Sequence, residues 1–288
     1  MKNDPAKWIG KIIDDFNVTG KNSLMNPQNE PAWDKPLVGF AKGNDPLWDE
    51  YKRHIGGFYW TPQEIFGLAF PSAPAKPDEI TVISWILPQT KQTRLDQRKE
   101  TSFPSERWAR SRKYGEEYNV KLRAHLVKTL AREGLDACAP LLLPQWKMET
   151  SEHYGLASSW SERHAAYAAG LGTFGLCDGL ITPLGKAIRC GSVVARITIE
   201  QTSRPYRNHH AYCLFYSQGT CGKCIDRCPV GAITKKGHDK SKCQRYVDIE
   251  TRNFINSQFG FDAYGCGLCQ VGVPCESQIP VKTKAGKR

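Results

Sequence analysis

Eight of the eleven cysteines lie in one stretch of the chain, between Cys213 and Cys275. Cysteine thiolates are soft ligands that favour iron–sulfur clusters. The densest part reads Cys221-x2-Cys224-x3-Cys228-Pro229. It is the end of the run C-x2-C-x2-C-x3-C-P, which holds [4Fe–4S] clusters through thiolate ligands. The first cysteine of that run is displaced rather than missing, because Cys213 precedes Cys221 with a longer spacing.

The remaining cysteines complete two sets of four. The cysteine before proline ligates the other cluster when two clusters are present. We therefore assign one cluster to Cys213, Cys221, Cys224 and Cys275, and the second to Cys228, Cys243, Cys266 and Cys269. Zinc and disulfides are the alternatives. Zinc sites usually show paired C-x2-C motifs without the C-x3-C-P ending, and disulfides are rare without secretion.

Composition indicates a globular chain of 288 residues with a net charge of +11. That charge suits a nucleic acid, an acidic electron-transfer partner or an anionic cofactor. The N-terminus shows no apolar signal region, and no apolar stretch approaches the ~20 residues that a membrane span requires. We expect a cytoplasmic protein without a membrane span.

The first two hundred residues predict alternating strands and helices. Residues 80–87 read as a central strand, 105–134 as a helix, 139–143 as a short strand and 187–200 as a long strand. Ser159 and Glu162 have the spacing of a capping box that opens a helix over 163–169. The aromatic patch that begins at residue 58 is interpreted as core. An α+β, α/β-like core is expected, followed by the cysteine domain.

A glycine-rich segment follows the helix, with five glycines between Gly170 and Gly185. Its G-x-G-x-x-G spelling follows a helix and precedes a strand, whereas a dinucleotide fingerprint follows a strand, so we reject NAD and FAD there. The segment is either a tight helix-to-strand connection or backbone that lies against a flat group. Two clusters attached to a large domain are expected to deliver electrons to an acceptor in that domain. This favours the interpretation that the glycine-rich backbone lies against a flat group.

The segment from Ser161 through Pro183, followed by the cysteine run, resembles the epoxyqueuosine reductase and reductive dehalogenase superfamily. That family shows E-R-x(6)-A-G-L-G-x-x-G-x-x-x-L-L-I-T-P before two [4Fe–4S] clusters, and the likeness covers about residues 155–275. It implies a nitroreductase-like core that binds a base-off corrinoid. The implied domains are an N-terminal segment at 1–75, a corrinoid-binding core at 76–205 and a bacterial-ferredoxin-like domain with two clusters at 206–288.

The resemblance also implies cofactor contacts and partners. The residues expected to bind cobalamin (a cobamide) are Ser158, Ser159, Gly170, Leu171, Gly172, Thr173, Phe174, Gly175, Cys177, Thr182 and Pro183. Cys138, Cys177 and Cys190 are interpreted as packing cysteines, and Cys177, inside the glycine segment, is the one of the three expected to touch a cofactor. The implied partners are a low-potential electron donor of the ferredoxin or flavodoxin type and either a small-molecule substrate or a corrinoid-accepting protein.

One departure from the family affects the expected activity. Epoxyqueuosine reductases have a catalytic aspartate six residues before the position of Glu162, and this chain has Leu156 there. Tyr154 is the substitute acid that we name. We expect a cobamide-dependent reductase of a small organic substrate. The alternatives are a cobamide-binding electron-transfer or cofactor-handling protein and, less favoured, a tRNA epoxyqueuosine reductase, which would make nucleic acid a partner.

Overall fold

The computed structural model describes residues 4–281, and the chain divides into two compact units. Unit 1 comprises Met1–Leu87, Lys113–Leu171 and Arg189–Pro205. Unit 2 comprises Pro88–Arg112, Gly172–Ile188 and Tyr206–Arg288. Unit 2 thus combines the cysteine region with two earlier segments of the chain. The three-part division at residues 75 and 205 stays a prediction.

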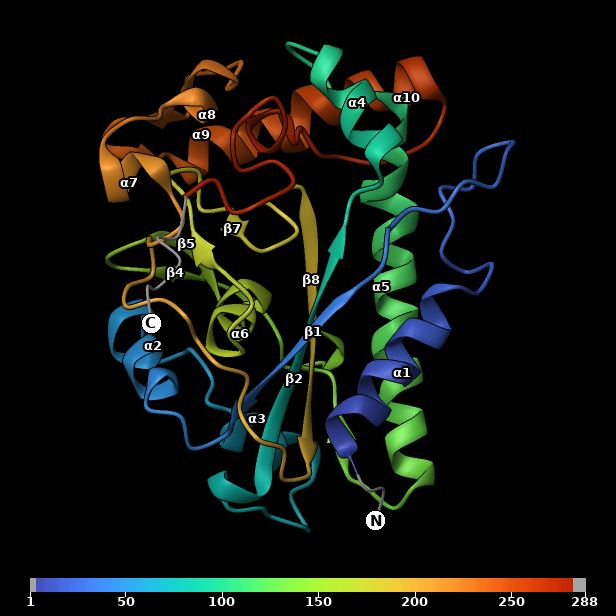
Figure 1. The fold of residues 1–288 in the computed structure, drawn as a ribbon, viewed down its shortest axis with the longest axis vertical. Helices are drawn as coiled ribbons and strands as arrows, with labels where there is room; N and C mark the ends of the chain where they lie inside the picture. Colours follow the sequence, from blue (N-terminus) through green and yellow to red (C-terminus); the bar gives the residue numbers. More distant parts are fainter. Residues whose placement is uncertain (1–3, 282–288) are drawn as a thin grey trace, which may run out of the picture. The chain divides into compact units, whose positions relative to one another are not determined.

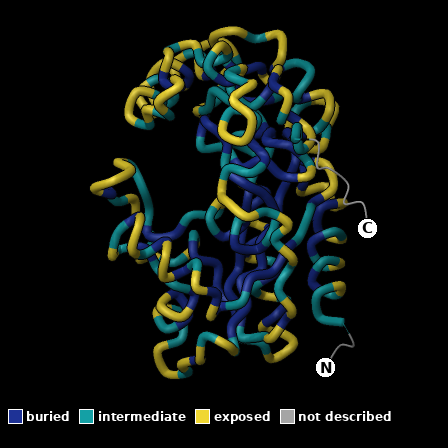
Figure 2. The backbone as a smooth tube through the Cα atoms, turned by 60° about the vertical axis from the view of Figure 1, so that its left-hand side comes forward, coloured by how far each residue is buried: buried dark blue, intermediate teal, exposed yellow. Residues whose placement is uncertain are grey.

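A four-stranded sheet organises unit 1, with the strand order β1-β2-β8-β3. The strands are β1 (Leu37–Lys42), β2 (Ile80–Pro88), β8 (Ile188–Arg196) and β3 (Ala137–Cys138). β1 pairs with β2 and β3 pairs with β8, both antiparallel. All nine residues of β2 are buried, which confirms the predicted central strand. Figure 2 colours the backbone by how far each residue is buried.

One face of this sheet is covered by α1 (Pro5–Asn17) and the unit 1 part of α5 (Glu106–Arg132) (Figure 1). Pro5 stands at the start of α1, where its missing N–H costs nothing, and the Asp4 side chain accepts a hydrogen bond from the N–H of Lys7. The two helices and β2 bury one apolar cluster that includes Ile13, Leu126 and Trp85. Burial at helical spacing explains why the α5 prediction from the sequence is correct.

The remaining elements of unit 1 lie mainly between β1 and β8 in the sequence. They are α2 (Leu47–Ile55), α3 (Pro62–Ala69), η1 (Pro77–Glu79), η2 (Pro140–Leu142), the hairpin β4 (Met148–Ser151) and β5 (Gly155–Ser158), and α6 (Glu162–Ala168). Trp48, Tyr59 and Trp160 are buried and stack together, so the aromatic patch belongs to the core.

Two local predictions are wrong. Residues 139–143 are largely 3₁₀ helix instead of strand, because Pro140 fixes a helical φ at the first position. The capping box does not form, because Ser161 is the N-cap and the hydroxyl of Ser159 is within 3.5 Å of the carbonyl of Lys147. The long strand predicted over 187–200 is confirmed as β8, which ends earlier than predicted, at Arg196.

Unit 2 consists of short elements. They are α4 (Lys91–Lys99), the start of α5, the hairpin β6 (Thr173–Phe174) and β7 (Leu180–Ile181), α7 (Leu214–Gln218), α8 (Lys223–Asp226), the hairpin β9 (Ile233–Thr234) and β10 (Gly237–His238), α9 (Lys240–Arg245), the π-helical η3 (Tyr246–Thr251), α10 (Arg252–Phe259) and η4 (Leu268–Gln270). Its largest apolar cluster contains cysteines, among them Cys177, Cys213 and Cys224. In the part of the chain that the structure describes, no helix is both long and apolar enough to cross a bilayer.

Candidate functional site

Four cysteines of unit 2 line one cavity. They are Cys213, Cys221, Cys224 and Cys275. Cys213 is the N-cap residue of α7 and Cys224 lies within α8, so two short helices bring these residues to the same cavity. The structure brings together the four cysteines that the sequence assigns to the first cluster. Apolar side chains such as Ile181 and Val273 complete the lining.

Cys228, Cys243 and Cys266 are neighbours in the same unit, and Cys269 lies near Cys266 but also contacts Cys177. Burial raises the pKa of the Cys266 thiol to about 12, and the adjacent Cys243 and Cys228 sulfurs add to this. The sulfur of Cys228 accepts a hydrogen bond of 3.2 Å from the N–H of Ala232. Backbone N–H groups directed at sulfur are typical of iron–sulfur sites, where they tune the reduction potential.

The turn that carries Cys266 and Cys269 is held by three side chains. Gly267 has a φ of +69°, and a Cβ there would lie 2.0 Å from the indole of Trp108. The buried amide of Gln97 donates a hydrogen bond of 2.8 Å to the carbonyl of Cys266. Arg227 donates one of 3.2 Å to the carbonyl of Leu268. Glycine is required here both for the backbone conformation and for the close approach of the ring.

The segment around Cys275 is equally constrained. The carbonyl of Cys275 accepts a hydrogen bond of 2.8 Å from the N–H of Lys186. A Cβ on Gly185, whose φ is +84°, would lie 2.2 Å from the carbonyl oxygen of Glu276. Glycine is therefore needed at position 185 for the hairpin segment to approach the cysteine segment.

This arrangement fits two thiolate-bound [4Fe–4S] clusters. All eleven cysteines are free, including the eight in the predicted sets. Among the described residues, no three His, Cys, Asp or Glu side chains are close enough to share a single metal ion. Four cysteines that line one cavity suit a polynuclear group, which needs one thiolate per iron.

A buried hydrogen bond between a lysine and a cysteine lies beside the cluster cysteines. The ammonium of Lys186 is 3.2 Å from the sulfur of Cys177, and both side chains are buried. Hydrogen bonds from Cys224 and Cys269, together with the Lys186 charge, hold the pKa of Cys177 well below its usual value despite burial. Burial disfavours the Lys186 ammonium, but the surrounding cysteine sulfurs raise its pKa. Nothing in the sequence indicated a role for Lys186.

A second polar contact reaches the other cysteine set. His238 is 3.0 Å from the carboxylate of Asp178, which has a φ of +56° in the β6–β7 turn. Burial lowers the pKa of His238, but the hydrogen bonds with Asp178 and Cys243 outweigh it and raise the pKa to about 10. The adjacent residues Cys177 and Asp178 thus make contacts toward different cysteines.

The glycine segment has a structural explanation within each unit. In unit 2, a Cβ on Gly172 would lie 2.3 Å from the carbonyl oxygen of Ile181, across the β6–β7 hairpin. The buried hydroxyl of Thr182 donates to the carbonyl of Gly185 at 2.8 Å. In unit 1, Gly170 has a φ of +75° and packs against the carbonyl of Ser203. The structure thus gives these glycines a backbone role that does not depend on a bound ring.

The residues predicted to bind a corrinoid are divided between the units. Unit 1 contains Ser158, Ser159, Gly170 and Leu171, and unit 2 contains Gly172, Thr173, Phe174, Gly175, Cys177, Thr182 and Pro183. Within unit 2, Gly175 and Cys177 share an apolar neighbourhood with Leu176 and Ile181. The hydroxyl of Ser158 donates to the carbonyl of Trp160 at 2.7 Å.

The candidate acid lies on the β4–β5 hairpin of unit 1. Tyr154 is in its turn with 52% of its surface exposed, and Leu156 lies on β5 opposite Thr150. The backbone N–H of Tyr154 donates a hydrogen bond of 3.2 Å to the hydroxyl of Ser151. The side chain of Tyr154 is therefore exposed at the turn of this hairpin.

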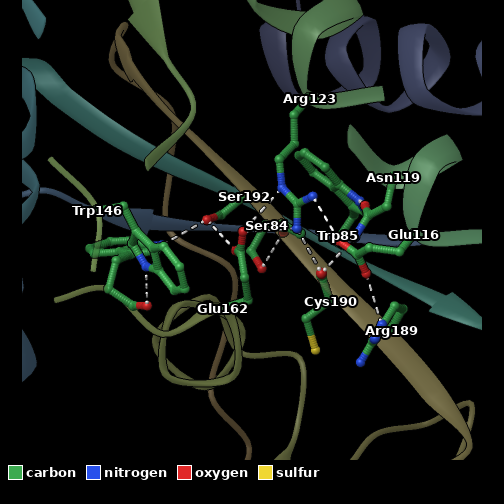
Figure 3. A network of polar contacts seen from close by, with 12 residues as sticks. Ser84, Trp85, Glu116, Asn119, Arg123, Trp146, Glu162, Arg189, Cys190 and Ser192 are labelled. Atoms are coloured by element: carbon green, nitrogen blue, oxygen red, sulfur yellow. Dashed lines mark hydrogen bonds and ion pairs between the residues drawn. The ribbon is translucent and has the colours of Figure 1, made fainter. Parts of the chain in front are cut away.

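Unit 1 also contains a buried polar network (Figure 3). Arg123 is 1% exposed and forms ion pairs with Glu116 at 3.2 Å and Glu162 at 3.1 Å. The hydroxyl of Ser192 donates to Glu162 and accepts from the indole of Trp160 at 3.0 Å. Burial raises the pKa of Glu162, and the Arg123 charge opposes that rise. Glu162, the glutamate of the family motif, therefore connects α6 to α5 and β8.

Comparison with known proteins supports the prediction that the cysteine region binds two [4Fe–4S] clusters. Residues 219–274 match a family described as a 4Fe-4S double cluster binding domain. The chain is an iron–sulfur protein with two [4Fe–4S] clusters.

The curated relatives of the chain include epoxyqueuosine reductases. The chain is similar to an epoxyqueuosine reductase of Bacillus anthracis, with 28% identity over 167 residues that cover 56% of this chain and 39% of that protein. It is also similar to an epoxyqueuosine reductase of Leadbetterella byssophila, with 34% identity over 117 residues that cover 39% of this chain and 36% of the relative. The chain thus spans about two fifths of the length of these relatives.

Two solved structures share the fold. One is an epoxyqueuosine reductase with a tRNA-Tyr epoxyqueuosine-modified stem loop, with a TM-score of 0.51, 17% identity and coverage of 94% of this chain and 64% of that chain. The other is the catabolic reductive dehalogenase NpRdhA in complex with 3-bromo-4-hydroxybenzoic acid, with a TM-score of 0.51, 16% identity and coverage of 96% and 37%. These comparisons confirm the predicted resemblance to the epoxyqueuosine reductase and reductive dehalogenase superfamily and the predicted fold class.

Proposed function

We propose that this protein is an iron–sulfur oxidoreductase that passes single electrons through its two clusters to a bound cobamide, at which a small organic substrate is reduced. The observation that carries the proposal is the pair of cysteine sets in unit 2. Four cysteines line one cavity, and Cys228, Cys243 and Cys266 are close to one another. Two adjacent clusters can pass electrons from one to the other. A protein that binds a metal only for structural stability does not need a second redox centre.

The ligands are proposed as the sequence assigns them. Cys213, Cys221, Cys224 and Cys275 hold one cluster, and Cys228, Cys243, Cys266 and Cys269 hold the other. The surrounding hydrogen bonds from Ala232, Gln97 and Arg227 fix the backbone and sulfur positions of the second set. Rigid ligands reduce the rearrangement that accompanies each electron transfer, so these residues position the cluster rather than react.

A base-off cobamide is the proposed acceptor because such a group requires a donor of very low potential, and [4Fe–4S] potentials extend to about −700 mV. The supporting residues are Ser158, Ser159 and the segment from Gly170 through Pro183. Tyr154 is the proposed proton donor, because the acid of the family is replaced by Leu156 and the phenol lies on the same hairpin. A ferredoxin or flavodoxin is the proposed electron donor, in the cytoplasm.

A spectroscopic titration tests the cobamide proposal. Anaerobically reconstituted protein is mixed with cobalamin, and the visible spectrum is recorded at increasing protein concentration. A shift to the base-off spectrum that saturates at micromolar protein supports the proposal. An unchanged spectrum at that concentration contradicts it, and leaves the clusters without the proposed acceptor.

Two other functions are each favoured by one observation. The relatives named epoxyqueuosine reductase, one of them solved with a tRNA stem loop, favour epoxyqueuosine reduction on tRNA. A salt-dependent gel shift with tRNA carrying epoxyqueuosine, together with its conversion, would support this function. The apolar Leu156 at the family's acid position favours a protein that reduces or delivers a cobamide to a partner. Base-off binding without substrate reduction would support that function.

A further inference from the structure

Lys186 is a buried cation that is surrounded by cysteine sulfur. Its side chain is 2% exposed, and its ammonium lies 3.2 Å from the sulfur of Cys177. It also lines the cavity that contains Cys224 and Cys275. Among the described residues, the side-chain hydrogen bond of Lys186 is to the sulfur of Cys177, and the nearby carboxylate of Glu276 is paired with Arg94 and Arg98. Its charge therefore faces cysteine sulfur.

A buried ammonium needs compensation, because removing such an ion from water costs several kcal/mol. A single cysteine supplies at most one negative charge. A thiolate-ligated [4Fe–4S] cluster is itself an anion, and its reduction adds one further negative charge. A fixed positive charge nearby stabilises the reduced form more than the oxidised form, and this effect is strong where water is excluded.

We propose that Lys186 is a positioning residue that acts as a fixed counter-charge for the iron–sulfur clusters and raises the reduction potential of the cluster held by Cys224 and Cys275. The inference rests on the ligand sets of the proposed function. In this proposal Cys177 holds the ammonium through the 3.2 Å contact and is taken as a neighbour of the clusters, outside the two ligand sets. Lys186 lines the cavity of the first set, and Cys269 of the second set is also among the sulfurs around its ammonium.

The location of Lys186 depends on the β6–β7 hairpin. A Cβ placed on Gly179 would lie 2.9 Å from the Cγ and Cδ atoms of Lys186 and 3.4 Å from the Cys177 sulfur. Gly179 has no left-handed backbone conformation, so Gly179→Ala displaces the lysine stem without backbone strain. This substitution moves the charge, whereas Lys186→Met removes it.

The test is a redox titration with dithionite of the reconstituted full chain, followed by electron paramagnetic resonance and without cobalamin. In Lys186→Met, the equilibrium between oxidised and reduced forms of one cluster shifts at least tenfold toward the oxidised form, which lowers its midpoint by 59 mV or more for a one-electron couple. Lys186→Arg keeps the charge and stays within threefold of the wild type. Lys223→Met, which removes an exposed lysine next to Cys224, is the matched control and leaves both midpoints unchanged.

Unchanged midpoints in a Lys186→Met protein that retains about eight iron atoms per chain overturn the inference. If that variant loses iron, Gly179→Ala decides: a downward shift of one midpoint supports the inference, and wild-type midpoints overturn it. Loss of iron in Cys177→Ser would also contradict the inference, since it would make Cys177 a ligand. These outcomes differ from a failure of the proposed function, which appears as absent cobalamin binding with the midpoints unaffected.

Discussion

Arg98 holds Glu276 with two hydrogen bonds, at 2.7 and 2.8 Å, and so fixes the residue that follows Cys275. Glu276 is only 3% exposed, and its carboxylate also accepts the N–H of Gly272 at 2.8 Å. Charge-assisted paired bonds of this geometry are stronger than neutral ones. The last cysteine of the first set is thus positioned by a helix, α4, that lies far from it in the sequence.

The Arg98 contact predicts an effect on cluster retention. Glu276→Gln weakens both hydrogen bonds and should increase the rate of iron loss to a chelator several-fold. Asp226→Asn, which changes an exposed carboxylate on α8, is the control and should lose iron at the wild-type rate. Equal rates for both variants and the wild type would show that Glu276 does not hold Cys275.

Gly267 and Gly260 form a matched pair for testing the second cysteine set. Both have a positive φ, but a Cβ on Gly267 meets Trp108, whereas a Cβ on Gly260 meets nothing within 4 Å. Gly260→Ala should therefore cost only the backbone strain of about 1–2 kcal/mol in unfolding free energy. Gly267→Ala should in addition displace the turn and yield protein with about half the iron. Full iron in Gly267→Ala would contradict the assignment of Cys266 and Cys269.

The buried network of unit 1 predicts a large stability effect. Arg123→Met leaves Glu162 and Glu116 without their shared cation, and breaking such a buried pair costs about 3–5 kcal/mol. Arg196→Met removes a half-exposed pair with Glu79 and should cost about 0–1 kcal/mol. Urea unfolding followed by tryptophan fluorescence measures both. Similar midpoints for the two variants would argue against the network as a structural support.

Cys138 and Cys190 provide a prediction about pH. Burial raises the pKa of each thiol from about 9 to about 12. Because their folded pKa is higher than the unfolded value, their contribution to stability is complete below about pH 9 and is lost as the pH rises toward 12. Native protein at pH 8 should therefore not react with iodoacetamide at these positions, while unfolded protein reacts at both. Labelling of native protein at pH 8 would refute their role as packing cysteines.

Tyr154 is the residue on which the reductase and cofactor-handling proposals differ. If it donates the proton, Tyr154→Phe lowers turnover by about 10²–10⁴-fold without affecting the iron content. Tyr264→Phe, which changes an exposed tyrosine of unit 2, should leave turnover unchanged. Full activity of Tyr154→Phe would exclude the phenol as the acid.

The sequence predicted elements whose apolar pattern is complete within one segment. Residues 80–88 are β-branched and buried throughout, and α5 has an apolar stripe, so both were predictable. The strand β1 was missed because only its pairing with β2 makes it a strand. The false capping box at Ser159 arose because tertiary contact with Lys147 engages that hydroxyl.

The candidate site was predictable where the spacing of residues in the sequence indicates their role as ligands. The eight cysteines follow a known ligand pattern, and four of them share a cavity. Lys186, Gln97 and Glu276 were not predictable, because each acts on a cysteine through a contact that only the folded chain creates. A single buried polar residue belongs to no repeating pattern or motif, so its role cannot be recognised from the sequence.

The central claim is that two clusters deliver electrons to a corrinoid, and cofactor analysis of the protein reconstituted anaerobically with cobalamin tests it most directly. If two clusters deliver electrons to a corrinoid, the protein contains about eight iron, about eight sulfide and one corrinoid per chain after gel filtration. Iron and sulfide near four, or full clusters that retain no corrinoid, would contradict it.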